Sequence, residues 1–128
     1  MDENTPQKAK ILIVDDSKLI RAAADKILKD DYEVVLANDG EQGWQIIESD
    51  EAVRVVFSDL TMPKLDGFAL LKRVRQSTAQ RVRDLPLIIM TTDADDESRR
   101  ETALQLGATD FISKPFNSLD MKARAKAH

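Results

Sequence analysis

Five residues of this chain have side chains that could carry out chemistry together if the fold brought them to one place. They are three carboxylates, an alcohol and an amine, at Asp15, Asp16, Asp59, Thr91 and Lys114. Clustered carboxylates repel one another and raise each other's pKa unless a cation neutralises them. A hard divalent ion relieves this repulsion, and Mg²⁺ completes its coordination with water and phosphate oxygens. These residue types together favour a magnesium site that receives a phosphoryl group.

Each of the five residues lies at the end of a predicted strand. Short apolar runs rich in β-branched residues predict strands over residues 10–16, 32–37, 53–59, 86–91 and 109–113. Asp15 and Asp16 end the first strand, Asp59 ends the third, Thr91 ends the fourth, and Lys114 follows the fifth. In an open parallel sheet the functional crevice lies at the carboxyl ends of the strands. We therefore expect the five side chains to meet at one edge of the sheet.

The segments between the predicted strands have the periodicity and end signals of helices. They cover residues 17–31, 38–51, 66–76 and 93–108, and a last helix begins at Ser118. Strict alternation of strand and helix predicts an α/β fold around a parallel sheet, with helices on both faces. The basic stretch RVRD at 81–84, before the fourth strand, is interpreted as a solvated loop, and a docking surface is the alternative.

Length, charge and composition limit the classes of function. The chain has 128 residues, the size of one domain, and we expect a flexible polar lead-in over 1–9 and a domain over 10–128. No segment approaches the roughly 20 apolar residues of a membrane span, so no membrane partner is expected. The net charge of −4 argues against nucleic-acid binding by this domain. The absence of cysteine excludes disulfides and thiol catalysis, and it fits a cytoplasmic location.

Four sequence segments around these residues resemble those of a known family. ILIVDDS (11–17), VVFSDLTMPKLDG (55–67), PLIIMTT (86–92) and DFISKPF (110–116) are similar, in order and spacing, to the signature segments of the receiver domains of two-component response regulators. The resemblance covers residues 10–127. It implies a flavodoxin-like (βα)5 fold, a three-layer sandwich whose five-stranded parallel sheet has the order 2-1-3-4-5.

The resemblance implies a role for each carboxylate. Asp59 matches the phospho-acceptor, which takes a phosphoryl group from a sensor histidine kinase or a phosphotransfer protein. Asp16 matches a direct ligand of Mg²⁺, and Asp15 matches the neighbour that reaches the ion through water. The backbone carbonyl of Thr61 matches a further ligand. Catalysis of this kind is mainly positioning and charge neutralisation.

The resemblance also implies how phosphorylation would be detected. Lys114 would neutralise the phosphoryl group, and Thr91 would move to form a hydrogen bond with it. Pro115 matches the family's cis-proline position, which would aim the lysine into the site. Phe111 matches an aromatic switch residue whose ring turns inward when the Thr91 region moves. We expect the surface of the helix over 93–108, the following strand and the last helix to change as a result.

Three residues beside the site are candidates for control of the phosphoryl lifetime. Thr92 stands where many relatives carry a smaller residue, and its bulk would restrict access to Asp59. Thr61 and Asp93 match the positions that tune loss of phosphate in the family. We expect both side chains to orient or obstruct the attacking water.

Several of these residues have an ordinary structural interpretation as well. Asp59 alone could cap a turn, and Asp15 and Asp16 suit the positive end of the helix that follows them. Phe111 in isolation could be a core residue. The Asp-Gly pair at 66–67 is interpreted as a turn and a helix start, without a role in catalysis.

Two other functions share parts of the pattern. A Mg²⁺-dependent phosphohydrolase with an aspartate nucleophile typically has a second aspartate two residues later, where this chain has Thr61, and it has a cap insertion. A flavodoxin-like mononucleotide binder needs a phosphate-cradling glycine-rich loop, which is missing here. The favoured function is a signalling switch that catalyses only its own phosphorylation and dephosphorylation.

The last helix bears on the output of such a switch. It has a thin apolar stripe of Leu119, Ala123 and Ala127 and no stop signal, which predicts that it continues into a linker or output domain. The stretch KPFNSLDMKARAKAH (114–128) is similar to receivers that precede diguanylate cyclase domains. A stand-alone receiver that controls a downstream protein is the alternative, and dimerisation on phosphorylation is left open.

Overall fold

The computed structural model describes residues 8–92, 95 and 97–128. In this part of the chain one sheet contains five parallel strands, in the order β2-β1-β3-β4-β5. They are β1 (Lys10–Val14), β2 (Glu33–Ala37), β3 (Val53–Asp59), β4 (Leu87–Thr91) and β5 (Asp110–Ser113). The predicted fold class and strand order are confirmed.

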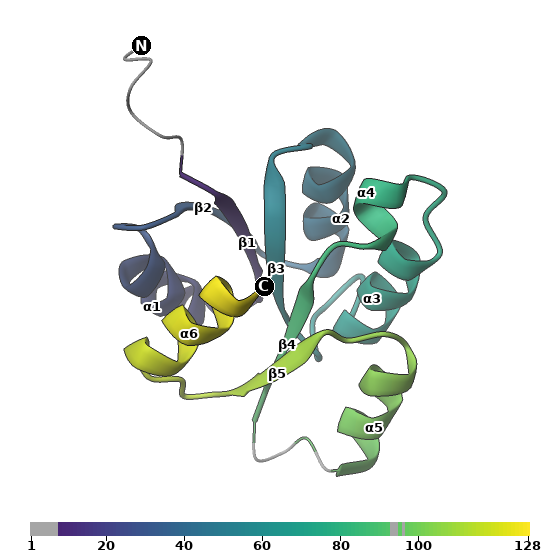
Figure 1. Cartoon of the computed structure of the whole chain (residues 1–128). Helices are drawn as coiled ribbons and strands as arrows, with labels where there is room; N and C mark the ends of the chain where they lie inside the picture. The colour runs from purple at the N-terminus through teal and green to yellow at the C-terminus, as the bar shows by residue number, and fades with distance from the viewer. Residues whose placement is uncertain (1–7, 93–94, 96) are drawn as a thin grey trace.

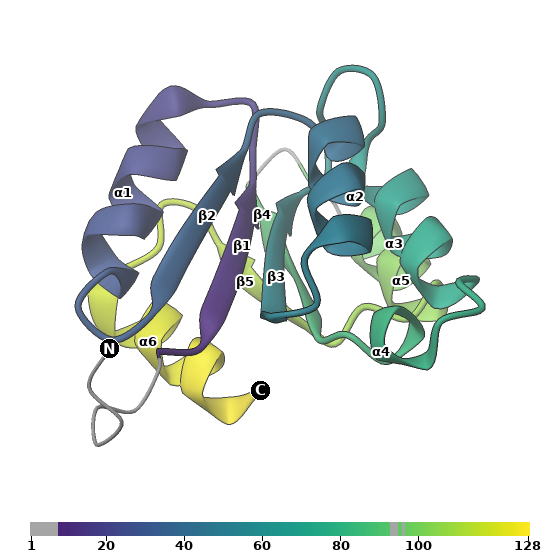
Figure 2. The same ribbon diagram turned by 90° about the horizontal axis from the view of Figure 1, so that it is seen from above.

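Helices cover both faces of the sheet and make three layers (Figures 1 and 2). The helices are α1 (Lys18–Leu28), α2 (Gly40–Ser49), α3 (Gly67–Arg75), α4 (Gln80–Arg83), α5 (Glu97–Gln105) and α6 (Ser118–Ala127). Figure 2 shows α1 and α6 on one side of the strands and α2, α3 and α5 on the other. In the described residues no helix is both long enough and apolar enough to cross a bilayer.

The apolar runs of the central strands supply both core layers. In β1, Ile11 and Ile13 pack toward α1 and α6, whereas Leu12 and Val14 pack toward α2 and α3. All four side chains are fully buried. A strand with helices on both faces has to be apolar at successive positions, which is why the alternating pattern of a half-exposed strand is missing here.

Three helix boundaries have the chemistry that their residue types favour. The Ser17 hydroxyl caps α1 by accepting a hydrogen bond from the backbone N–H of Ile20 at 3.3 Å. Asp66 caps α3 by accepting from the backbone N–H of Ala69 at 2.9 Å, so the turn-and-helix-start interpretation is confirmed. Gly107 follows α5 with a φ of +104°, a conformation that glycine adopts without strain.

The predicted solvated loop at 81–84 is wrong, because this connection contains the short helix α4. Val82 and Leu85 are buried, and the guanidinium of Arg81 donates to the carbonyl oxygens of Ile47 and Glu48 at 3.0 and 2.9 Å. A helix of four residues is too short to produce a visible period in the sequence.

The predicted apolar stripe of α6 is also wrong. Leu119, Ala123 and Ala127 are exposed, and Leu119 is 81% accessible. The buried residues are Met121 and Ala125, which are four positions apart and face α1. The pattern misled because the larger apolar residue, Leu119, lies in the first turn of α6 and points to solvent.

Arg75 joins four backbone segments at the amino-terminal edge of the sheet. Its guanidinium donates to the carbonyl oxygens of Gly107, Arg83 and Leu85 at 2.9, 2.9 and 2.7 Å, and to the Thr109 hydroxyl at 3.2 Å. Burial lowers the pKa of this guanidinium. One side chain thus ties the end of α3 to α4, to the start of β4 and to the turn between α5 and β5.

Replacement of this arginine tests its structural role. Arg75→Met removes four hydrogen bonds but keeps the apolar stem, and we expect it to lower the free energy of unfolding by about 2–4 kcal/mol. Arg73→Met is the matched control on the same helix. Arg73 contacts the Trp44 ring and Glu41 at the surface, so its loss should change stability by less than about 1 kcal/mol. Urea unfolding followed by circular dichroism measures both, and equal effects would contradict this account.

Candidate functional site

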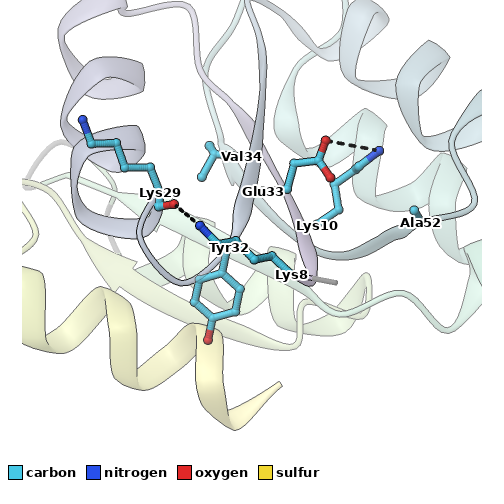
Figure 3. A pocket seen from close by; sticks show the side chains of 7 residues that line it. All are labelled: Lys8, Lys10, Lys29, Tyr32, Glu33, Val34 and Ala52. Atoms are coloured by element: carbon cyan, nitrogen blue, oxygen red, sulfur yellow. Dashed lines mark hydrogen bonds and ion pairs between the residues drawn. The ribbon is translucent and has the colours of Figure 1, made fainter. Parts of the chain in front are cut away.

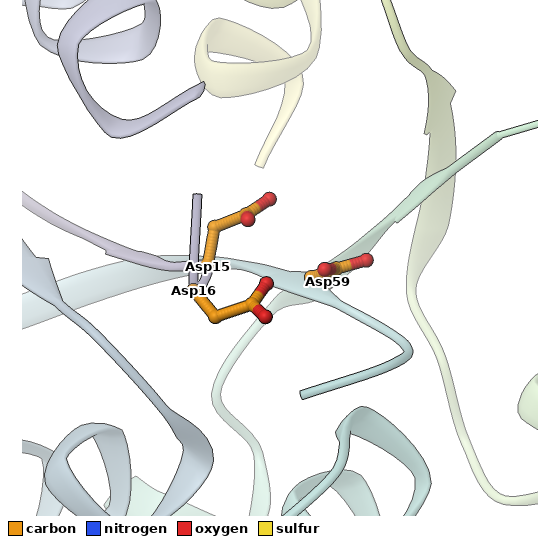
Figure 4. Close-up of side chains that lie close together, drawn as sticks. All are labelled: Asp15, Asp16 and Asp59. Carbon is orange, nitrogen blue, oxygen red and sulfur yellow. The ribbon is translucent and has the colours of Figure 1, made fainter. Parts of the chain in front are cut away.

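The three predicted carboxylates lie together at the carboxyl edge of the sheet. Figure 4 shows Asp15 and Asp16, which follow β1, beside Asp59 at the end of β3. One carboxylate oxygen of each residue lies within 4.8 Å of the other two. Asp15 is fully buried and Asp59 is 8% exposed, whereas Asp16 is exposed. The cluster is therefore buried on one side and open to solvent on the other.

Strand register explains why Asp15 and Asp59 are neighbours. Val14 of β1 is paired with Ser58 of β3, so the next residue of each strand comes to the same level. Gly67 brings the chain back against the end of β3, where a Cβ atom would overlap the carbonyl oxygen of Asp59. The loop between β3 and α3 is thereby held close to Asp59.

Lys114 joins two of the carboxylates. Its ammonium nitrogen lies 2.8 Å from Oδ2 of Asp15 and 3.1 Å from Oδ1 of Asp59. The backbone N–H of Lys114 donates to the carbonyl of Thr91 at 2.6 Å, which fixes the end of β5 against the end of β4. The Lys114–Pro115 peptide bond is cis, which agrees with the family's cis-proline position that Pro115 matches.

The electrostatics of the cluster single out Asp59. Burial raises the pKa of the Asp59 carboxyl, the charge of Asp15 raises it further, and Lys114 only partly opposes this. Burial alone would lower the pKa of the Lys114 ammonium, but the hydrogen bond and charge of Asp15, together with Asp59, raise it overall. The lysine stays charged while the ionised form of Asp59 is disfavoured.

The donor set fits a divalent cation. Three carboxylates form the cluster, and the ion pairs found among the described residues join it to a single ammonium, that of Lys114. The excess is negative, and hard oxygen ligands at this spacing suit Mg²⁺.

Thr91 and Phe111 lie beside this edge. Thr91, the last residue of β4, is buried, and its hydroxyl is 3.5 Å from the carbonyl oxygen of Ile112 in β5. Phe111 is partly buried and packs against the core layer under α3 and α5. It also lines an open surface cavity of about 340 Å³ together with Leu104 of α5. Both the core and the switch interpretations of Phe111 fit this position.

The structure describes two of the three residues that are candidates for control of the phosphoryl lifetime, Thr61 and Thr92. Thr61 is exposed in the loop after β3, and its hydroxyl accepts a hydrogen bond from Arg99 at 3.1 Å. Thr92 is partly buried, and its backbone N–H donates to Asp95 at 2.8 Å. Asp93 lies outside the described residues.

Two of the three carboxylates, those of Asp15 and Asp59, also accept hydrogen bonds from nearby backbone N–H groups. Asp15 accepts from the backbone N–H of Ser17 at 2.9 Å, and Asp59 accepts from that of Leu60 at 2.8 Å. Each of these residues therefore stabilises a turn and also belongs to the cluster. The N-cap of α1 is Ser17, so the helix-capping interpretations of Asp15 and Asp16 are both wrong.

An open cavity of about 660 Å³ lies at the opposite, amino-terminal edge of the sheet (Figure 3). Its lining includes three lysines, but Lys10 forms ion pairs with Asp50 and Glu33 at 2.7 and 3.9 Å. Lys8 donates to the carbonyl oxygen of Lys29 at 3.3 Å. The ammonium groups of Lys8 and Lys10 are thus engaged within the chain, and the cavity is remote from the carboxylate cluster.

Comparisons with known proteins define the family. The model of the response regulator receiver domain matches residues 11–126, so the chain belongs to the receiver-domain family of two-component response regulators. Proteins of this class act in phosphorylation-dependent signalling and are not metabolic enzymes.

Individual relatives agree with the family. A probable transcriptional regulator, ycf27, of Porphyridium aerugineum is 40% identical over 122 residues, 94% of this chain and 48% of that protein. The chain spans about half the length of the curated relatives it matches. The structure of a putative response regulator of Chloroflexus aurantiacus has a TM-score of 0.86 and 30% identity, covering 94% of this chain and 97% of that one. A probable two-component response regulator/GGDEF domain protein has a TM-score of 0.84 and 26% identity, covering 94% of this chain and 49% of that one.

The raised pKa of Asp59 has a measurable consequence for stability. The folded state binds the Asp59 proton more tightly than the unfolded chain does, so ionisation destabilises the fold as the pH rises above the usual value of 3.8. Asp59→Asn should therefore stabilise the metal-free protein by about 1 kcal/mol near pH 7. The gain should disappear below the usual pKa, where Asp59 is protonated in both states.

Urea unfolding in the presence of a chelator, near pH 7 and near pH 3.5, measures this difference. Asp66→Asn is the control, because Asp66 is exposed and asparagine is an equally good helix cap. A stabilisation by Asp59→Asn that is the same at both pH values would show that burial of the charge is not its cause.

Proposed function

We propose that this chain is a phosphorylation-dependent switch that accepts a phosphoryl group on Asp59 in a Mg²⁺-dependent reaction. The observation that carries the proposal is the position of Lys114, whose ammonium lies between the buried carboxylates of Asp15 and Asp59. Family membership supports it, since receiver domains belong to two-component systems. The donor would be a sensor histidine kinase or a phosphotransfer protein.

Three carboxylates and one backbone carbonyl would hold the metal, from Asp15, Asp16, Asp59 and Thr61. The ion would neutralise and orient the phosphoryl oxygens. Asp16 is exposed and can approach an ion directly, whereas Asp15 is engaged with Lys114 and Ser17. This difference supports a direct ligand at Asp16 and contact through water at Asp15.

The contacts of Asp59 indicate which oxygen reacts. Leu60 and Lys114 both contact Oδ1, so Oδ2 is the oxygen that we expect to attack phosphorus. The bond from Oδ2 to phosphorus forms while the bond from phosphorus to the donor atom breaks, and the donor departs with the electron pair. Lys114 already lies within contact of the acceptor and would neutralise the transferred group with little movement.

Phosphorylation would shift the population between two conformers. The Thr91 hydroxyl is held only at 3.5 Å by Ile112, so exchanging that contact for a phosphoryl oxygen would cost little. Phe111 lines a surface cavity together with Leu104 of α5, and its ring would follow the movement of Thr91. The changed surface would be that of α5, β5 and α6, where Leu104 and Leu119 are exposed. A differential contact of this kind is what biases a switch.

We further propose that residues 10–128 are a cytoplasmic receiver module that controls an output domain or a downstream protein. Relatives named as transcriptional regulators and a solved GGDEF-domain protein share this module over about half of their length. A diguanylate cyclase output and a DNA-binding output are therefore both candidates. Nucleic-acid binding would belong to the output domain, and phosphorylation could act by promoting a homodimer.

Labelling with acetyl phosphate tests the proposed function. We expect the chain to incorporate about one phosphoryl group per molecule, to require Mg²⁺, and to lose the label in Asp59→Ala. Asp66→Ala, in the same loop, is the control and should retain the label. Radiolabel incorporation or intact mass measures the product, and multiple turnover on a phosphate ester would instead identify a phosphohydrolase.

Thr61 and Asp93 are proposed to set the lifetime of the phosphorylated form. Both residues match positions that tune loss of phosphate in the family, and Thr61 lies exposed in the loop after β3, so exchanging both side chains should change the path of the attacking water. We expect the first-order loss of label from Asp59 to change by roughly threefold or more. In a separate test, Thr92→Ala should increase the rate of labelling, since the smaller side chain would restrict access to Asp59 less. An unchanged decay rate in the Thr61/Asp93 double variant would refute the lifetime role.

A further inference from the structure

Arg99 connects α5 to the loop that follows the acceptor residue. Its guanidinium donates to Oδ1 of Asp95 at 3.0 Å and to the hydroxyl of Thr61 at 3.1 Å. The guanidinium carbon also lies 5.2 Å from the centre of the Phe68 ring in α3. We name this arrangement of Thr61, Phe68, Asp95 and Arg99 the Arg99 clamp. It joins two segments that are 38 residues apart in the sequence.

The clamp continues to the residue that follows Thr91. Oδ2 of Asp95 accepts a hydrogen bond from the backbone N–H of Thr92 at 2.8 Å, while Oδ1 is held by Arg99. The Asp95 side chain is only 8% exposed, so the carboxylate end of these charge-assisted contacts is shielded from water, whereas the Arg99 side chain is 40% exposed. A continuous set of contacts therefore leads from the end of β4, through Asp95 and Arg99, to the loop after Asp59.

This set of contacts exists while the Thr91 hydroxyl is turned toward Ile112 of β5. Thr92 is the next residue after Thr91, so any movement of Thr91 toward the acceptor displaces the N–H that Asp95 holds. Asp95 cannot follow freely, because Arg99 fixes it to Thr61 and rests on Phe68. A contact made in one conformer and weakened in the other stabilises the first.

We propose that Arg99 is a positioning residue that stabilises the unphosphorylated arrangement by fixing Asp95 to Thr61. This inference rests on the proposed function, because it requires that Thr91 moves toward a phosphoryl group on Asp59. Arg99 touches neither the carboxylate cluster nor Lys114 through any contact in the described residues. It acts on the equilibrium between the two arrangements, and thereby sets how much of the protein is ready to receive the phosphoryl group.

Binding of beryllofluoride, a phosphoryl mimic, in the presence of Mg²⁺ tests the inference. Arg99→Met keeps the apolar contact with Phe68 but removes the hydrogen bonds to Asp95 and Thr61. Because the competent arrangement becomes more populated, the apparent Kd for beryllofluoride should fall about fivefold. Thr61→Val removes the same hydrogen bond from the opposite side, and it should have an effect in the same direction. Isothermal titration calorimetry measures each Kd.

Arg100→Met is the matched control, since Arg100 is the exposed arginine next to Arg99 in α5 and its variant should bind beryllofluoride like the wild-type protein. The double variant with Arg99→Met and Thr61→Val should bind no more tightly than Arg99→Met alone, because the hydrogen bond that Thr61→Val removes is already absent in Arg99→Met. The affinity of Arg99→Met for Mg²⁺ alone should stay within about twofold of the wild type. If Arg99→Met merely destabilised the fold, the variant would bind both Mg²⁺ and beryllofluoride more weakly. Tighter binding of beryllofluoride therefore distinguishes a positioning role of Arg99 from a loss of stability.

The outcomes distinguish this inference from the proposed function. If the wild-type protein binds no beryllofluoride with Mg²⁺, the proposed function is refuted and the inference with it. If the wild type binds but Arg99→Met binds equally or more weakly, the positioning role of Arg99 alone is refuted. Additive effects of the Arg99 and Thr61 substitutions would likewise show that the two residues act separately.

Discussion

The ion pairs from Lys114 to Asp15 and Asp59 are the interaction on which this edge of the sheet depends. Two buried carboxylates from neighbouring strands lie side by side, and like charges in such a place are unfavourable unless a cation lies between them. The lysine that supplies it follows β5, 99 residues away from Asp15. Only a sheet in which the ends of β1, β3 and β5 reach a common edge can bring these groups together.

The same arrangement of charges lowers the stability of the fold at this edge of the sheet and suits the edge to chemistry. One ammonium, paired with two of the three carboxylates, leaves an excess of negative charge in the cluster, and the raised pKa of Asp59 shows where that charge is least well accommodated. The fully buried apolar side chains on both faces of the central strands support this arrangement. A bound divalent cation would relieve this imbalance, so the metal ion that the site is proposed to bind would also stabilise the fold.

The sequence predicted the parts of the molecule that follow from periodicity and from strand ends. Asp15, Asp59 and Lys114 were identifiable because each follows an apolar run, and parallel strands align their carboxyl ends. The short helix α4 was missed because four residues produce no period. The buried face of α6 was misjudged because the orientation of a helix depends on what it packs against.

The contact between Arg99 and Thr61 could not have been predicted in this way. Arg99 lies in a run of charged residues that reads as an ordinary solvated helix start, and nothing in the residue types points to a partner 38 positions away. The orientation of α5 against the loop after β3 decides the contact. That orientation depends on tertiary packing, and it cannot be read from the local sequence of α5.

Arg75 has a consequence for the way α5 can move. The guanidinium donates to the carbonyl oxygen of Gly107, just beyond the carboxyl end of α5, and to Thr109 at the start of β5. It therefore fixes one end of the helix, while the other end adjoins the candidate switch. A helix that is anchored at one end can tilt about that end but cannot shift along its axis. A rearrangement that begins at the proposed phosphorylation site would thus move the first turn of α5 most and its last turn, which Arg75 anchors, least.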